Sequence, residues 1–314
     1  MPITGRNRDG ARYGCTRTRQ TASNSNSGWA AVVGAASCCS ANRLCANAAW
    51  WKLPAIILAP WPVIRSEHYR AWLRFRCDLV AEQFAILRQV FHEAVEKSGV
   101  KTTPQPMLGA FLADAQLVGL HSNESLNQSL DYLANMVYAD GDGVRQEVAE
   151  LAPRSRGKLL VTLAPGYQMS PPGDARSQVL EAVMGGSKGF IAWNYDIGMT
   201  TGHLVDMAEA IKMFAPVEDI ILDGAIQDGY GCDRDSVNLL ARKVGAVSAL
   251  LVSDYSARPG QTRVTVPGRN RLEVIDLFTN EVVARLDAGR RVFYARLGQN
   301  FQARLYHLRP AGDS

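Results

Sequence analysis

The apolar residues between positions 67 and 97 recur with the spacing of an α-helix. They stand three, four or seven residues apart, at Leu73, Val80, Phe84, Leu87, Phe91 and Val95. Residues at these spacings lie on one side of a helix, so the pattern predicts a helix with an apolar face. Gly99 follows Lys97 and is suited to end the helix, because glycine adopts the left-handed backbone found at many helix ends.

Downstream of this helix, strand-like and helix-like segments alternate. The strand-like segments are short and largely apolar, at residues 105–111, 130–138, 158–163 and 189–195. The helix-like segments are at residues 144–151, 175–184 and 202–214. Alternation at these lengths is typical of βαβ units, which place a parallel sheet beside a layer of helices. Continuous apolar runs such as KLLVTL fit strands that are buried on both faces.

Beyond residue 246 the pattern changes to short β segments. Six of them, separated by Gly, Asn and Pro turns, occupy residues 247–310. This spacing predicts a small all-β sandwich. We therefore expect an α/β fold, with a partial or complete (β/α) barrel in residues 66–235 and a β-sandwich in residues 246–310. The boundary between them is predicted near residues 224–246, where the sequence DGAIQDGYGCDRD (residues 223–235) is loop-like.

Residues 1–65 do not match the rest of the chain. They mix Arg, Ser, Asn, Ala and Cys without strand or helix periodicity, which predicts a poorly structured or atypical leader. The apolar run WAAVVGAASCCSA is a poor signal peptide, because a long Arg-rich stretch precedes it. Both a cytoplasmic and a secreted location stay open on this sequence.

The charge of the chain is uneven. The net charge is +4, and residues 1–65 carry eight Arg and Lys against the single Asp9, so the remainder carries a net charge of −3. The body lacks the basic surplus that nucleic-acid binding requires, so no nucleic-acid partner is expected. No apolar run approaches the roughly 18–20 residues that span a bilayer, so no membrane segment is expected. The Cys and His residues show no zinc-ligand spacing, so no metal is expected.

Several segments resemble one family of enzymes. LDYLANMVYADGD, KLLVTLAPGYQ and EAVMGGSKGFIAWNYDIGMTTGHLVDMAEAIKMF look like the sixth, seventh and eighth strands, with flanking helices, of clan-A-like glycoside hydrolases. Residues 272–308 resemble the β-domain that often follows such (β/α)8 barrels. The resemblance implies a barrel whose N-terminal half is lacking ahead of residue 66, and an enzyme without an organic cofactor. The chain departs from the family after the seventh strand, where Pro165, Gly166 and Tyr167 replace the usual nucleophilic Glu.

Three aspartates stand where barrel enzymes carry their working groups, at the ends of strands. Asp140 and Asp142 follow the strand-like segment 130–138, and Asp196 follows the segment 189–195. Glycoside hydrolysis needs two carboxyl groups, one to protonate the leaving oxygen and one to attack the sugar or activate water. We predict these aspartates as candidate catalytic residues. Alternatively, Asp140 and Asp142 shape a turn in ADGDG, and Asp196 caps the segment that follows it.

Aromatic and amide side chains at the same strand ends are candidate sugar-binding residues. Trp193 and Tyr195 alternate on one strand and so point the same way, where a sugar ring can stack on them. Asn194 lies between them, and Tyr167 and Gln168 follow the preceding strand. The alternatives are ordinary packing inside the barrel for Trp193 and Tyr195, and a turn for Tyr167 and Gln168.

The sequence therefore predicts a glycoside hydrolase-like protein that cleaves a glycosidic bond of an oligo- or polysaccharide with paired carboxylates. Two alternatives stay open: a non-catalytic carbohydrate-binding relative, and a truncated barrel fragment without activity. A half barrel leaves sheet edges and apolar strand faces uncovered, so the fragment is expected to form homo-oligomers or to aggregate.

Overall fold

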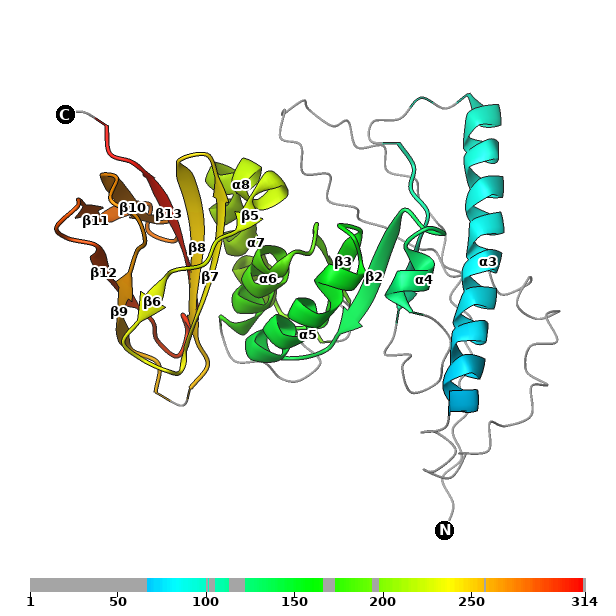
Figure 1. Cartoon of the computed structure of the whole chain (residues 1–314), viewed down its shortest axis with the longest axis horizontal. Helices are drawn as coiled ribbons and strands as arrows, with labels where there is room; N and C mark the ends of the chain where they lie inside the picture. The colour runs from blue at the N-terminus through cyan, green and yellow to red at the C-terminus, as the bar shows by residue number, and fades with distance from the viewer. Residues whose placement is uncertain are drawn as a thin grey trace, which may run out of the picture.

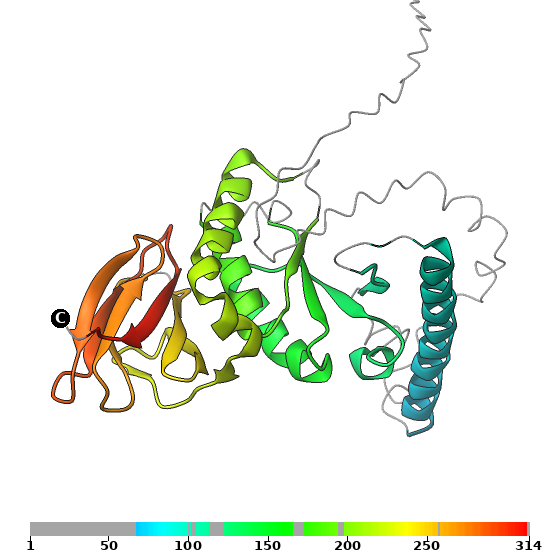
Figure 2. The same cartoon turned by 90° about the horizontal axis from the view of Figure 1, so that it is seen from above.

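The computed structural model describes most of the chain from residue 67 onward. The described residues are 67–99, 101, 105–112, 122–165, 173–193, 198–256 and 258–312, so the predicted leader at 1–65 lies outside them. Figure 1 and Figure 2 show a parallel sheet, a layer of helices beside it, and antiparallel strands beyond the helices. None of the described helices is both long and apolar enough to cross a membrane.

Four parallel strands form the first layer, in the order β1-β2-β3-β4. They are β1 (Gly109–Leu112), β2 (Tyr132–Val137), β3 (Leu159–Leu163) and β4 (Phe190–Ala192). The helices are α3 (Glu67–Ser98), α4 (Asn123–Leu126), α5 (Gly141–Arg154), α6 (Asp174–Gly185), α7 (Thr201–Phe214) and α8 (Glu218–Asp223), with a 3-10 turn at Ala215–Val217. Every strand and helix predicted for residues 67–214 is found, so the expected parallel α/β arrangement is confirmed.

The helices pack on one face of the parallel sheet. Leu133 pairs with Leu159 and Val137 with Leu163 across β2 and β3, so these side chains share a face. All four lie in the buried cores that also contain residues of the helices. The residues that lie between these positions along each strand point to the opposite face. Met136 is one of them, and it takes no part in those cores. The second face therefore corresponds to the inner face of a barrel.

A partly buried carboxylate holds the long helix α3 against the sheet. Asp131, at the start of β2, accepts hydrogen bonds from Arg88 Nε at 2.7 Å and from the backbone N–H of Leu108 at 2.9 Å. His92 Nε2 lies 2.9 Å from the second carboxylate oxygen. Burial alone would raise the pKa of Asp131, but these hydrogen bonds outweigh it and the net shift is downward.

Helix α6 is enclosed on all sides. Every residue from Asp174 to Met184 is buried. Its buried charges are paired: Asp174 accepts the backbone N–H of the first residue of α5 at 3.1 Å, and Arg176 bonds to a carboxylate on α7. The guanidinium of Arg176 also lies 5.0 Å from the ring of Phe278 and 4.6 Å from that of Phe301, both in the antiparallel part. The helix thus connects the two halves of the molecule.

The antiparallel strands form two packed sheets. Their orders are β11-β10-β13-β8-β7-β5 and β12-β9-β6. The strands are β5 (Ala225–Ile226), β6 (Gly231–Cys232), β7 (Val237–Val244), β8 (Val247–Asp254), β9 (Gln261–Thr265), β10 (Leu272–Asp276), β11 (Glu281–Leu286), β12 (Val292–Arg296) and β13 (Ala303–Pro310). The six predicted segments are β8 to β13, and the expected all-β sandwich after the α/β part is confirmed.

The predicted loop at 223–235 is wrong in part, because it contains the two short strands β5 and β6, and a third strand, β7, follows it. β5, β6 and β7 pair within the sandwich, so its strands begin at Ala225 rather than near residue 246. The strand β7 (VNLLARKV) carries Asn, Arg and Lys among its apolar residues. These polar residues hide the apolar alternation that identifies a strand in sequence. The division into domains at residues 235 and 246 stays a prediction.

Strand β8 belongs to two cores at once. Leu250 and Val252 face the interior of the sandwich, whereas Ala249 and Leu251 pack in the core formed with the helices. Residues on one strand alternate between its faces, so the strand is buried on both. The six-stranded sheet is therefore the middle layer between the helices and the three-stranded sheet.

We expect Gly173→Ala to destabilise the fold strongly. Gly173 precedes α6 with φ of 87°, and an added Cβ would lie 2.2 Å from the carbonyl oxygen of Asn300. The left-handed backbone and the clash together should lower the free energy of unfolding by at least about 2 kcal/mol, measured by urea denaturation. Gly157→Ala is the matched control, because Gly157 has φ of 76° but no atom within 4 Å of an added Cβ. Equal losses in the two variants would contradict a role for the contact with Asn300.

Candidate functional site

Three of the described side chains lie at the carboxyl ends of the parallel strands. Phe111 lies in β1, Asp140 follows β2, and Trp193 follows β4. We call these three residues the strand-end surface. Five other predicted residues, Tyr167, Gln168, Asn194, Tyr195 and Asp196, lie outside the described residues. Their roles stay predictions.

Phe111 and Trp193 form an exposed aromatic pair. Their ring centroids are 6.0 Å apart with the planes tilted by 55°. Strands β1 and β4 are separated by β2 and β3, so roughly 14 Å would separate them in a flat sheet. The contact therefore indicates that the sheet curves toward the face opposite the helices. The two side chains remain 48% and 40% exposed, respectively.

The backbone holds both aromatic residues in place. Phe111 pairs in register with Ala134 of β2, and the N–H of Trp193 donates to the carbonyl of Leu163 at 2.7 Å. Their rings are thus carried by the sheet rather than by a free loop. Sequence analysis predicted Trp193 as a sugar-binding residue but missed Phe111, because no local pattern reveals that residues 82 positions apart meet.

Asp140 begins helix α5. It is the N-cap residue, and its side chain accepts the backbone N–H of Gly143 at 2.9 Å. Asp140 is exposed, so its second carboxylate oxygen is open to solvent. The capping contact fits the alternative that Asp140 shapes the turn. Its predicted catalytic role is neither supported nor contradicted by this contact.

Asp142 is engaged in an ion pair on α5. Its carboxylate accepts hydrogen bonds from Arg145 Nη2 at 2.7 Å and from Gln146 Nε2 at 2.8 Å. Such contacts between residues three and four apart stabilise the first turns of a helix. They account for Asp142 as a structural residue, and its catalytic role stays a prediction.

The sequence gives no sign of the carboxyl group whose pKa is most strongly raised, that of Glu181. Its side chain is 1% exposed, and the hydroxyl of Tyr255 donates to it at 2.9 Å. Burial raises the pKa of Glu181 to about 7, while hydrogen bonds from Ser253 and Tyr255 and the charge of Arg145 act in the opposite direction. Glu181 lies on α6 and faces β8, and its partner Tyr255 also packs against Gly141 at the start of α5. Nothing in its local sequence distinguishes it from a surface glutamate.

No site for a metal ion is found in the described part of the chain, where no three His, Cys, Asp or Glu residues are close enough to bind one. His203 takes part instead in the capping box of α7, with the backbone N–H of Thr200 donating to its Nδ1 at 3.1 Å. His203 therefore helps to cap the N-terminus of α7.

No protein-family model matches the chain, and no curated protein is significantly similar to it in sequence. Among solved structures, the chain is similar to an alpha-amylase from Geobacillus thermoleovorans complexed with acarbose (12% identity, TM-score 0.40), covering 64% of this chain and 60% of that one. An alpha-amylase from Anoxybacillus is 11% identical over 74% of this chain and 64% of that one, with a TM-score of 0.38. A GH30 endoxylanase from Clostridium papyrosolvens is 14% identical, covering 60% of this chain and 50% of that one, with a TM-score of 0.35. These similar structures are glycoside hydrolases, the class that the sequence resembles, and the chain spans less than two thirds of each.

We expect Glu181→Gln to change how stability depends on pH. A folded pKa of about 7 lies above the ordinary glutamate value of 4.5, so the glutamic acid stabilises the fold fully below pH 4.5. That contribution is lost as the pH rises from 4.5 through 7, amounting to about 3 kcal/mol. The glutamine side chain of the variant would not titrate but can still accept the hydroxyl of Tyr255. The variant should therefore gain stability relative to the natural chain between pH 5 and pH 8, measured by urea unfolding.

Glu281→Gln is the control for this experiment, because Glu281 is exposed at the start of β11. The stability of the Glu281→Gln variant relative to the natural chain should change little between pH 5 and pH 8. A Glu181→Gln variant that shows the same small change would mean that the fold does not raise the pKa of Glu181.

Proposed function

We propose that this protein binds an oligo- or polysaccharide at its strand-end surface. The observation that carries the proposal is the exposed pair of aromatic rings, Phe111 and Trp193, at the carboxyl ends of a curved parallel sheet. Barrel proteins place their ligand sites at this end of the strands. The C–H groups of a sugar ring pack well against an aromatic face, whereas its hydroxyl groups stay hydrated.

The tilt of the two rings favours an extended glycan over a single enclosed sugar. Rings tilted by 55° cannot sandwich one sugar between parallel planes. Instead, the faces of the Phe111 and Trp193 rings lie one after the other on an open surface, where each can pack against a different sugar of the same chain. Asp140 is exposed at the same end of the sheet, where its free oxygen can accept hydrogen bonds from sugar hydroxyl groups.

We expect Trp193→Ala to weaken glycan binding about fivefold, because an aromatic stacking contact contributes about 1 kcal/mol. Affinity electrophoresis against starch, xylan and other soluble polysaccharides measures the effect. Tyr294→Ala is the matched control, because Tyr294 is an aromatic residue of β12 that is 53% exposed but far from the parallel sheet. Equal weakening in both variants, or no retardation of the natural chain by any polysaccharide, would contradict the proposal.

Hydrolysis of the bound glycan is the more specific form of this proposal. Asp140 and Asp196 would supply the two carboxyl groups, since both follow strands whose ends share one edge of the sheet. Carboxyl groups roughly 5 Å apart would give a retaining reaction and those roughly 6.5–9.5 Å apart an inverting one. The carbohydrate-binding alternative keeps the aromatic pair and lacks turnover.

We expect Asp140→Asn to reduce turnover at least about 100-fold if hydrolysis occurs, because it removes a carboxyl group that takes part in proton transfer. Asparagine is as good an N-cap as aspartate, so α5 and the stability of the fold should be preserved. Release of reducing sugars or of nitrophenol from aryl glycosides gives the rate. Unchanged turnover in Asp140→Asn would remove Asp140 from the catalytic residues. No turnover by the folded natural chain would favour the binding alternative.

A further inference from the structure

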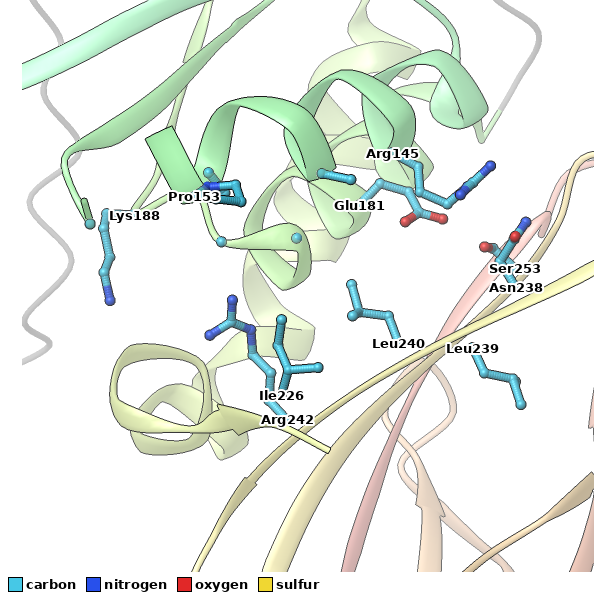
Figure 3. A pocket seen from close by; sticks show the side chains of 15 residues that line it. Arg145, Pro153, Glu181, Lys188, Ile226, Asn238, Leu239, Leu240, Arg242 and Ser253 are labelled. Carbon is cyan, nitrogen blue, oxygen red and sulfur yellow. The ribbon is translucent and has the colours of Figure 1, made fainter. Parts of the chain in front are cut away.

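A second candidate site lies where the helices meet the sandwich. A cavity of about 550 Å³, which we call the junction cavity, is bounded by α5 and α6 on one side and by β5, β7 and β8 on the other. Figure 3 shows the side chains that line it. Its volume falls in the range of small-molecule sites, which occur preferentially between packed units. It includes Gly157 and Lys188, which precede β3 and β4, so it is distinct from the strand-end surface.

Strand β7 provides one wall of the junction cavity with three kinds of side chain in a row. Asn238, Leu240 and Arg242 alternate with residues that pack in the sandwich core, so all three point toward the helices. The row spans roughly 13 Å, given a rise of about 3.3 Å per residue. It begins with an amide, continues with an apolar side chain and ends with a cation.

One end of the junction cavity is cationic. Arg242 donates from Nε to the carbonyl of Met184 at 2.8 Å and from Nη1 to that of Gly224 at 3.1 Å. These bonds fix the guanidinium and leave Nη2 without a partner among the described residues. Lys188 lines the same cavity, with its ammonium group 2.8 Å from the carbonyl of Leu222. No described carboxylate forms an ion pair with either cation, so this end can accept an anionic group.

The other end carries the uncharged hydrogen-bonding side chains of Asn238 and Ser253. Asn238 pairs with Ser253 across β7 and β8, and Ser253 bonds to Glu181 on α6. The amide of Asn238 makes no hydrogen bond within the described part of the chain, so its donors and acceptor are free for a ligand. The charge of Arg145 at this end is already paired with Asp142. This end therefore suits hydroxyl groups rather than a second charge.

We propose that the junction cavity binds a small sugar acid, with its carboxylate at Arg242 and Lys188 and its hydroxyl groups at Asn238, Ser253 and Glu181. Between the two ends, Leu240 provides an apolar surface for the C–H face of a sugar ring. Ile226 extends this surface beside Arg242, with which it pairs across β5 and β7. A ligand of this kind would form hydrogen bonds with the free amide of Asn238 and with the free Nη2 of Arg242 at the same time. The proposal does not depend on glycan binding at the strand-end surface.

Lactobionate and lactose provide a matched pair of probes. Both carry a galactose ring, but lactobionate has a carboxylate at the opposite end and lactose is neutral. We expect isothermal titration with the full chain to give an affinity for lactobionate at least about tenfold higher than for lactose, because a charged hydrogen bond is lost with lactose. Equal affinities, or no binding of lactobionate, would overturn the proposal.

Variants locate the bound probe. Lys188→Gln should weaken lactobionate about fivefold and leave lactose unchanged, because it removes a charge without removing an enclosed side chain. Lys243→Gln is the matched control, since Lys243 is the next residue of β7 after Arg242 and is exposed on the other face. Leu240→Trp should abolish binding by filling the cavity, with circular dichroism verifying that the variant folds.

Trp193→Ala distinguishes this site from the strand-end surface. It should leave lactobionate binding unchanged, whatever its effect on polysaccharides. Loss of lactobionate binding in Trp193→Ala would place the probe at the strand-end surface and overturn the proposal. Retained binding in a folded Leu240→Trp variant, or equal weakening by Lys188→Gln and Lys243→Gln, would overturn it as well.

Discussion

The complete burial of helix α6 is the constraint on which the rest of the structure depends. A helix that carries Asp174, Arg176 and Glu181 cannot be buried unless each of these charged groups finds a partner, because an unpaired buried charge costs several kcal/mol. The partners come from three directions: the start of α5, a carboxylate on α7, and Tyr255 after β8. The positions of the neighbouring elements are therefore fixed by the polar residues of one helix.

This arrangement makes the α/β part and the sandwich energetically inseparable. The stacking of Arg176 on Phe278 and Phe301 and the two-sided burial of β8 both cross between them. Loss of the sandwich would expose Arg176 and Glu181 together with the apolar surface of the helices. We infer that the sandwich serves first to cover the helical layer, and that the junction cavity arises where the two surfaces do not fill the space between them.

The parallel sheet is organised differently on its two faces. One face is covered by α4, α5 and α6, whereas the other curves and brings Phe111 and Trp193 together. Curvature is what turns separate strand ends into one surface, because side chains on a flat sheet would stay apart. The proposed glycan site thus depends on the shape of the sheet, while the proposed sugar-acid site depends on the packing of two layers.

The sequence by itself determined the elements, because the period of apolar residues reflects local backbone geometry. It predicted the long helix α3, the four parallel strands and the six strands β8 to β13, and it marked Asp140 and Trp193 as residues at strand ends. It did not reveal β7, whose Asn238 and Arg242 face the junction cavity, nor whether Asp140 caps a helix or serves chemistry. Only the tertiary structure decided that Phe111 meets Trp193 and that Glu181 is buried with a raised pKa. Both depend on segments far apart in the chain, and the distance and burial between such segments are set by packing rather than by local pattern.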